Sequence, residues 1–176
     1  MKFINKSKWA ILLAIIIFGA NQIYSQETTC PCCAEQYQQF DFWIGDWNVY
    51  DTTGTLVGTN KITKSQDDCI LAENWKSNKS DFTGTSYNFY NKSDSTWNQT
   101  WVDNKGGNLM LKGRLTDGKM VLSSGLLKGK KVDWYFNRIT WTPKSDGNVT
   151  QLWEIVGKDG VVLNTAFFGI YKRNTK

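Results

Sequence analysis

The folded part of this 176-residue chain begins with an aromatic segment, Phe40-Asp41-Phe42-Trp43-Ile44-Gly45-Asp46-Trp47-Asn48-Val49-Tyr50. Side chains of a strand alternate between two faces, so Phe42, Ile44 and Trp47 cannot all lie on one face. We therefore expect an irregularity at Gly45-Asp46, where a glycine lets a strand bend or another backbone come close. The segment is interpreted as the strand that plugs and starts an antiparallel β-barrel, around which the later strands wrap.

Beyond this segment, the chain alternates between strand-like runs and turns. Turn residues recur at regular intervals, for example at 51–54, 104–107 and 145–148, and the runs between them are rich in Val, Ile, Thr and aromatic residues. No amphipathic helical pattern follows residue 40. The sequence therefore predicts an all-β domain, a single antiparallel up-and-down β-barrel of about ten strands.

The first 25 residues have the organisation of a secretory signal peptide. Lysines precede the apolar run Trp9–Phe18, and the small residues that follow favour cleavage after Ser25. The run is too short for a membrane anchor, which needs about twenty apolar residues. Lipid attachment at Cys30 is disfavoured because residues 27–29 form a poor lipobox. We expect a protein exported to the periplasm or outside the cell, without a stable membrane span after cleavage. Its expected parts are a signal helix at 1–25, a cysteine-rich leader at 26–39 and a barrel at 40–176.

Composition excludes several classes of site. The sequence has no histidine, which excludes a histidine general base, a Ser-His-Asp or Cys-His pair, and every histidine-containing zinc site. Taking Lys2, Lys6 and Lys8 of the predicted signal peptide from the formal net charge of +5 leaves +2. A net charge this small does not indicate a basic surface for binding nucleic acid. We expect no nucleic-acid partner and no cofactor, and the sequence leaves the oligomeric state open.

Three predicted strands each place tryptophan beside a glutamate or glutamine on the same face. In the best-patterned strand, 96–103, the residues Trp97, Gln99 and Trp101 share one face and the threonines share the other. The same alternation groups two further sets: Leu71, Glu73 and Trp75, and Val149, Gln151 and Trp153. We expect the bulky faces to point inward and the threonine face to point to water, as in one-sided burial of an antiparallel sheet.

Several segments, in order, resemble a bacterial family of secreted or cytosolic domains of unknown function that are similar in fold to lipocalins. The residues that carry the resemblance are FDFWIGDW at 40–47, DCILAENW at 68–75, SYNFY at 86–90, WNQTWVD at 97–103, RITW at 138–141, QLWE at 151–154 and YKR at 171–173. Each piece alone is a weak signal, and the ordered set from Phe40 to the end is the specific one. The resemblance implies a calycin-like barrel that can hold a small molecule, and it brings no defined activity.

The resemblance also implies how the barrel closes. Gly45-Asp46-Trp47 is similar to the Gly-x-Trp that opens the first strand of lipocalins, where the tryptophan closes the barrel floor against an arginine from a late strand. Either Arg173 or Arg138 could serve here. The expected closing set is Trp43, Gly45, Trp47 and Arg173. Haem-binding barrels similar to nitrobindin are related by fold, but they ligate iron through a histidine, which this chain lacks.

The candidate ligand site combines interior polar groups with aromatic walls. Its predicted members are Glu73, Asn88, Gln99, Arg138 and Gln151, framed by Trp75, Trp97, Trp101 and Trp153. Aromatic walls supply buried area and convergent polar groups orient a ligand, so we expect a pocket for a small, partly apolar molecule. Arg138 would suit a carboxylate or a phosphate on that ligand. Alternatively, Arg138 and Glu73 pair internally with the amides and fix the barrel register without a ligand.

Two further hypotheses come from other classes of protein. In an enzyme, Glu73 would be the acid or base of an isomerase- or cyclase-like reaction, with a pKa raised by apolar neighbours. Asp103 and Glu154 are secondary candidates for that role. In an interaction module, the barrel would be solidly filled and its outer surface would bind another protein.

The four cysteines predict a covalent link between the leader and the barrel. In an oxidising compartment an even number of cysteines indicates disulfides. Bonds within the cluster at 30–33 would strain the geometry, so we expect Cys69 to pair with Cys33 or Cys30. The remaining two could form a strained local bridge or join another chain. A weaker alternative is a soft-metal site made by Cys30, Cys32, Cys33 and Cys69.

Overall fold

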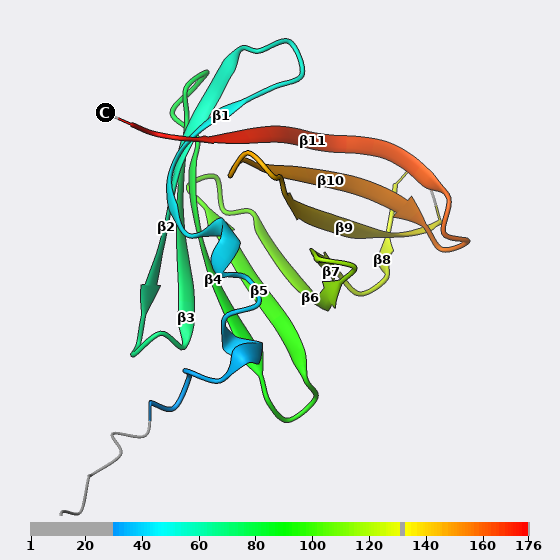
Figure 1. Cartoon of the computed structure of the whole chain (residues 1–176). Coiled ribbons are helices and arrows are strands. Elements are labelled where there is room, and N and C mark those ends of the chain that lie inside the picture. The colour runs from blue at the N-terminus through cyan, green and yellow to red at the C-terminus, as the bar shows by residue number, and fades with distance from the viewer. Residues whose placement is uncertain (1–29, 131–132, 176) are drawn as a thin grey trace, which may run out of the picture.

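A computed structural model describes residues 30–130 and 133–175 of the chain. The predicted signal peptide at residues 1–25 lies outside the described residues. Over the described part the fold is all-β: ten antiparallel strands form a closed barrel and one short strand is added to it (Figure 1). The expected barrel of about ten antiparallel strands is therefore confirmed. None of the helices in these ranges is long and apolar enough to span a membrane.

Two single-turn 3₁₀ helices precede eleven strands in the described ranges. Their bounds are η1 (Glu35–Tyr37), η2 (Asp41–Trp43), β1 (Gly45–Tyr50), β2 (Leu56–Ser65), β3 (Ile70–Ser77), β4 (Thr83–Asn91), β5 (Thr96–Asp103), β6 (Asn108–Thr116), β7 (Lys119–Ser123), β8 (Leu127–Lys128), β9 (Trp134–Pro143), β10 (Val149–Gly157) and β11 (Val162–Arg173).

The connectivity of the barrel is almost entirely between sequence neighbours. The strand order is β10-β11-β1-β2-β3-β4-β5-β6-β7-β9-β8, and a further pairing between β10 and β9 completes the ring. The two-residue β8 pairs only with the start of β9 and stands outside the ring. The first and last strands meet with Trp47 opposite Arg173. A closed ring leaves none of its ten strands as a free edge.

The aromatic segment is not a single strand, which corrects the expectation from the sequence. Strand β1 begins only at Gly45, and η2 precedes it. Phe40 and Trp43 are completely buried, and their rings stack with centroids 5.0 Å apart. A strand would direct residues three apart to opposite faces, whereas a 3₁₀ turn superimposes positions i and i+3. The turn therefore lets both rings fill one end of the barrel, where Phe40 also contacts Trp97 and Trp141.

The structure places an irregularity at Gly45, as expected from the sequence. The group that comes close to Gly45 is a side chain and not another backbone. The φ of Gly45 is +145°, and a Cβ built there would lie 1.8 Å from Nη1 of Arg173. The Arg173 guanidinium lies 4.0 Å from the centre of the Trp47 ring and donates a hydrogen bond of 2.6 Å to the carbonyl of Ile44. The indole of Trp47 donates to the carbonyl of Trp43 at 2.8 Å. These contacts fasten the start of β1 to the end of β11.

Two disulfides are present, and their pairing corrects the expected one. Cys69 is bonded to Cys32, and Cys30 is bonded to Cys33. The Cys33 amide donates to the Cys30 carbonyl at 3.4 Å, so this segment folds as a turn that brings their Cα atoms to 5.4 Å. That distance lies within the ordinary range for disulfides. The turn therefore removes the steric objection to a bond within the cluster and leaves Cys32 to reach the turn before β3.

Candidate ligand-binding cavity

One end of the barrel is filled and the other is hollow. The filled end holds Phe40 and Trp43, next to the start of β1. The hollow end contains a cavity of about 650 Å³ that reaches the loops joining β1 to β2 and β3 to β4. Its lining consists of Asp51, Thr52, Val57, Glu73, Trp75, Ser77, Lys79, Ser80, Phe82, Gln99, Trp101, Leu109, Ile139, Gln151, Trp153, Thr165, Ala166, Phe167, Phe168 and Tyr171. This volume is in the range of small-molecule sites, roughly 300–1,000 Å³.

Indole rings make much of the cavity wall. Trp75, Trp101 and Trp153 all line the cavity, and Phe167 packs edge-on against Trp75 with ring centroids 6.0 Å apart. The Trp101 ring lies against Gly84 of the neighbouring strand, where a Cβ would be 2.0 Å from the ring. The ring therefore occupies the space of the missing side chain instead of projecting across the lumen. Glycine on β4 helps to keep the cavity open.

A carboxylate lies at the base of the cavity. Glu73 on β3 lines the cavity, yet only 4% of its surface is exposed. Its Oε1 accepts a hydrogen bond from Nδ2 of Asn60 on β2 at 2.7 Å, and its Oε2 accepts one from Oγ of Ser86 on β4 at 2.5 Å. Ile62 and Ser86 are the residues paired with Glu73 in the adjacent strands. Both partners of the carboxylate are neutral donors.

A chain of buried amides fixes the direction of these hydrogen bonds. Gln99 donates to Oδ1 of Asn88 at 2.9 Å, and Asn88 donates to Oγ of Ser86 at 2.9 Å. Gln99 also donates to the same Oγ at 3.4 Å. Because the Ser86 hydroxyl accepts from both amides, its single hydrogen is available to Glu73. On the opposite wall, the Tyr171 hydroxyl donates to Oε1 of Gln151 and accepts a longer bond of 3.5 Å from Asn60.

Burial changes the acidity of both ionisable groups in this network. Burial raises the pKa of Glu73 from 4.5 to about 7, and the hydrogen bonds from Ser86 and Asn60 oppose that increase. The pKa of Tyr171 is raised well above its ordinary value, first by burial and then by the charge of Glu73. None of the ion pairs among the described residues includes Glu73. The cavity base thus holds an acidic group without a cationic partner from this part of the chain.

The structure brings six of the nine predicted ligand residues to the cavity. They are Glu73, Trp75, Gln99, Trp101, Gln151 and Trp153. Asn88 is buried behind this surface as part of the amide chain. Trp97 is also inward but lies at the filled end, where its indole donates to Gln39 and its ring contacts Phe40.

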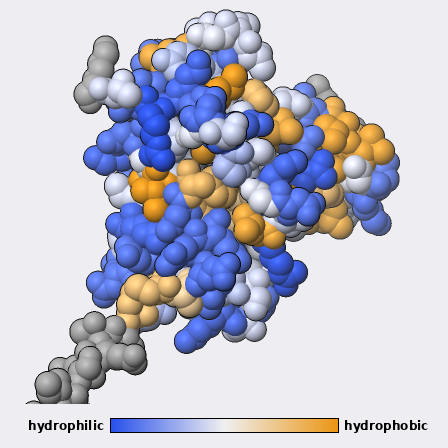
Figure 2. Space-filling view, in the orientation of Figure 1, coloured by the Kyte–Doolittle hydropathy of each residue, from blue (hydrophilic) through white to orange (hydrophobic). Residues whose placement is uncertain are grey.

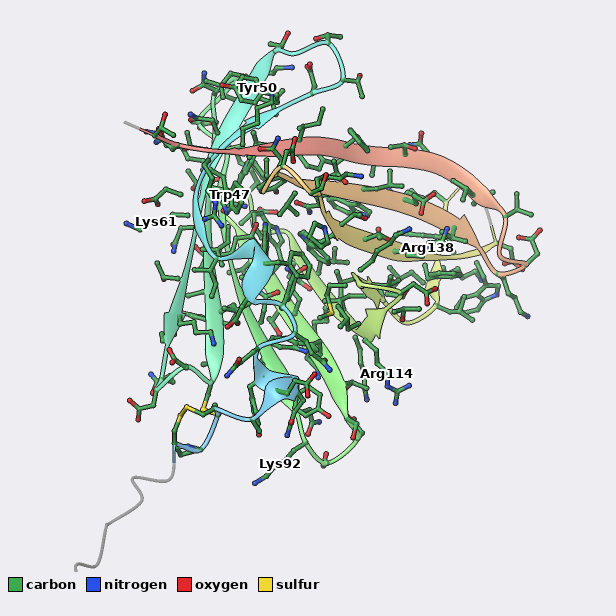
Figure 3. The ribbon with its side chains drawn as sticks, in the orientation of Figure 1. Trp47, Tyr50, Lys61, Lys92, Arg114 and Arg138 are labelled. Carbon is green, nitrogen blue, oxygen red and sulfur yellow. A yellow bond between two sulfur atoms is a disulfide. The ribbon has the colours of Figure 1, made fainter. Side chains whose placement is uncertain are left out.

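The predicted interior position of Arg138 is wrong. On β9 the buried residues are Asn137, Ile139 and Trp141, so alternation directs Arg138 to the outer face (Figure 3). There its Nε and Nη2 both lie 3.0 Å from Oε2 of Glu154 on β10. The alternative of an internal network is therefore wrong for Arg138, whereas Glu73 does hydrogen-bond internally, to the Asn60 amide and to the Ser86 hydroxyl. The outward position follows from alternation along β9, because Ile139 and Trp141 occupy the inward face.

The two secondary catalytic candidates also lie away from the cavity lining. Glu154 is committed to Arg138 on the outer face. Asp103 accepts hydrogen bonds from the backbone amides of Lys105 and Gly107 in the turn after β5, and these bonds lower its pKa. Of the three proposed acids, only Glu73 lies at the cavity.

Sequence reasoning missed three members of the polar network: Asn60, Ser86 and Tyr171. Each has a period-two signal. Asn60 alternates with the buried Ile62, Ser86 with Asn88, and Tyr171 with Gly169. The pattern does not identify the hydrogen-bond partner of each residue. A serine or asparagine on an inward face indicates a polar network only when Glu73 is known to lie within hydrogen-bond distance of it.

The outer surface carries its own hydrophobic residues. Six of the ten exposed large hydrophobic residues in the described part of the chain gather at the ends of β8 to β11 and the loops beside them, where Figure 2 shows a hydrophobic cluster on the space-filling surface. Its exposed members are Leu126, Leu127, Trp134, Val161, Val162 and Leu163. A solidly filled barrel, the third hypothesis from the sequence, does not agree with the cavity described above.

The cysteines do not form a metal site in this structure. All four sulfur atoms are in disulfides, which leaves no thiolate to bind a soft metal. Within residues 30–130 and 133–175, no group of three or more His, Cys, Asp or Glu side chains is placed to hold a metal ion. No protein-family model matches the chain, and no curated protein matches it significantly.

Proposed function

We propose that this protein is an exported, lipocalin-like binding protein that holds a small, partly apolar molecule in the hollow end of its barrel. The observation that carries the proposal is the cavity of about 650 Å³, which has aromatic walls and a base of hydrogen-bonding groups. Walls of this kind supply buried apolar area, and the few polar groups orient the ligand. The ordered set of segments that resembles lipocalin-like domains supports the same interpretation.

Export is supported by the disulfides. Bonds such as Cys30–Cys33 and Cys32–Cys69 form and persist in oxidising compartments and are rare in the cytosol. The signal-peptide pattern of residues 1–25 agrees with this location. An anionic ligand is not part of the proposal, because that preference rested on Arg138, which lies outside the barrel.

The proposal is tested by blocking the cavity. Ala166 lines the cavity, and Ala166→Phe would place an aromatic ring in it. With 1-octanol, octanoate and octylamine as probes, we expect at least one to change the tryptophan fluorescence of the wild-type protein, because three indoles line the site. We expect Ala166→Phe to weaken that binding at least tenfold.

Val102→Phe is the matched control. Val102 lies on β5 and is 52% exposed, so the same ring is added to the outer surface. We expect its probe affinity to equal that of the wild type, with thermal melts showing that both variants are folded. Binding that is equal in both variants, or no binding of any probe to the wild type, would reject the cavity as the ligand site.

Acid–base catalysis by Glu73 remains a second candidate function. A pKa of about 7 suits a group that gives and takes protons near neutral pH, and Glu73 touches the cavity. Binding is the better-supported function, because it does not require a second acid or base next to Glu73. Among the described residues no second carboxylate or amine lies beside Glu73 at the cavity base.

A further inference from the structure

The charge of Glu73 has no counterpart among the described residues inside the barrel. A carboxylate buried to this extent is normally paired with a cation, because removal of its hydration is costly. The charged residues of the cavity lining are Glu73, Asp51 and Lys79. Nζ of Lys79 lies 3.4 Å from Oδ2 of Asp51, at the mouth. Lys79 and Asp51 thus pair with each other, and Glu73 is the uncompensated charge of the lining.

The surrounding hydrogen bonds are arranged for a carboxylate and not for a carboxylic acid. Both oxygens of Glu73 already accept, Oε1 from Asn60 and Oε2 from Ser86. The Ser86 hydroxyl cannot readily accept a proton from Glu73, since it accepts from Asn88 and Gln99. Two strands, β2 and β4, therefore supply donors that converge on one anion. This arrangement stabilises the ionised group in a place where burial opposes it.

Two further features favour a cation as the missing partner. The faces of indole rings attract cations, and Trp75, Trp101 and Trp153 line the same cavity as Glu73. In addition, Oδ1 of Asn60 is buried and accepts no hydrogen bond from any described residue. Its neighbouring Nδ2 is bonded to Glu73, so an unused acceptor accompanies the carboxylate. An ammonium group has several N–H donors and no acceptor, which complements such a site.

We propose that the ligand is an apolar molecule that ends in a protonated amine, and that its ammonium group pairs with the Glu73 carboxylate at the base of the cavity. The inference rests on the proposed binding function and names its ligand class. The apolar part of the amine occupies the space between the indole rings. The protein thereby recognises its ligand by one ion pair in a cavity that otherwise offers apolar and neutral polar contacts.

The test compares three probes with the same alkyl chain. Octylamine, 1-octanol and octanoate are titrated by calorimetry at pH 8, above the pKa of Glu73 of about 7. An alkylamine remains protonated there, since its pKa is near that of lysine, about 10.4. We expect octylamine to bind at least tenfold more tightly than 1-octanol, and octanoate to bind most weakly. As the pH falls below 7, the preference for octylamine should shrink because Glu73 becomes neutral.

The second part of the test repeats these titrations with the Glu73→Gln variant. Rotation of the Asn60 amide would turn its unused Oδ1 toward the amide introduced at position 73, so we expect a folded variant. Octylamine should lose at least tenfold in affinity while 1-octanol changes less than threefold. Glu154→Gln is the control, because it removes the carboxylate paired with Arg138 on the outer face. It should leave all three affinities unchanged.

The possible results are distinguishable. If 1-octanol binds as tightly as octylamine at pH 8, or Glu73→Gln affects both equally, the amine class is wrong while the binding function stands. If none of the three probes binds the wild-type protein, the binding function itself fails. Should Glu73→Gln not fold, the pH dependence of the ratio of wild-type affinities decides the question alone.

Discussion

Gly45 shows how one residue without a side chain allows the barrel to close. The space beside its Cα is occupied by the guanidinium of Arg173, which stacks on Trp47 and bonds the carbonyl of Ile44. An arginine at this place offers a planar cation to the indole and several N–H donors to the backbone, and a lysine would offer neither the plane nor the fork. The contact that closes the barrel therefore depends on both Gly45 and Arg173.

Substitution of Gly45 is expected to cost more than substitution of a glycine in open space. Gly54 also has a positive φ, +82°, but a Cβ there would meet nothing within 4 Å. We expect Gly54→Ala to lower the free energy of unfolding by about 1 kcal/mol through backbone strain, and Gly45→Ala by roughly 3 kcal/mol. Urea denaturation measures both. In an Arg173→Ala background the extra cost at Gly45 should largely disappear, and equal costs in both backgrounds would contradict the contact.

Glu73 is expected to make stability fall as the pH rises. Its pKa in the folded protein, about 7, is above the ordinary 4.5, so folding favours the protonated form. The cost of an ionised Glu73 is absent below pH 4.5, grows between pH 4.5 and 7, and is complete above 7, where it reaches about 3 kcal/mol.

The measurement is the difference in unfolding free energy between the wild type and Glu73→Gln from pH 5 to pH 8. Carboxyl groups with lowered pKa values, such as Asp51 and Asp103, contribute stability that is lost on acidification, and their effects cancel in this difference. We expect the wild type to lose stability relative to the variant as the pH rises. Parallel pH profiles would show that Glu73 does not titrate in this range.

At the scale of elements, the described part of the leader and the start of the aromatic segment, residues 30–43, form a plug that is attached to the barrel. Its aromatic residues Phe40 and Trp43 fill the barrel end, and Lys64 of β2 pairs with Asp41 of η2 at 2.8 Å. The Cys32–Cys69 bond ties the leader to the turn before β3. A segment that the sequence presents as a leader followed by a first strand thus closes one end of the barrel, and in the described part of the chain the cavity reaches the loops at the other end.

The two disulfides are expected to differ in their contribution to stability. Cys32 and Cys69 are separated by 37 positions, while Cys30 and Cys33 are separated by 3. The loop-entropy relation gives about 4 kcal/mol for the long loop and about 2 kcal/mol for the short one. We therefore expect the Cys32→Ser, Cys69→Ser double variant to lower the free energy of unfolding by more than the Cys30→Ser, Cys33→Ser variant does. Equal losses in thermal or urea unfolding would mean that the long bond does not restrain the leader.

At the scale of the whole molecule, one end of the barrel interior is packed and stabilises the fold, and the other end contains a cavity. The lower part, which is the filled end, is packed with aromatic rings, with Trp43, Trp97 and Trp141 in contact with Phe40. The upper part leaves a cavity of about 650 Å³ above Glu73. The binding and amine proposals belong to this upper part. Substitutions in the lower part are expected to change stability with little effect on the cavity lining.

Strand periodicity was a good guide to this molecule wherever one face is clearly apolar. It placed Trp101, Gln99 and Glu73 on inward faces and indicated the number of strands. The same alternation places Arg138 on the outer face, since Ile139 and Trp141 occupy the inward face of β9. The error at Arg138 is therefore an error of interpretation and not a limit of the sequence.

The sequence alone determined the all-β class, the alternation of faces and the exclusion of histidine chemistry, because these depend on residue types and on spacings of a few positions. Only the tertiary structure decided which cysteines pair, that Phe40 and Trp43 form a plug, and that Asn60 and Ser86 converge on Glu73. Those features join residues that are distant in the chain or depend on a turn. Their partners become neighbours only after the ring of strands has closed.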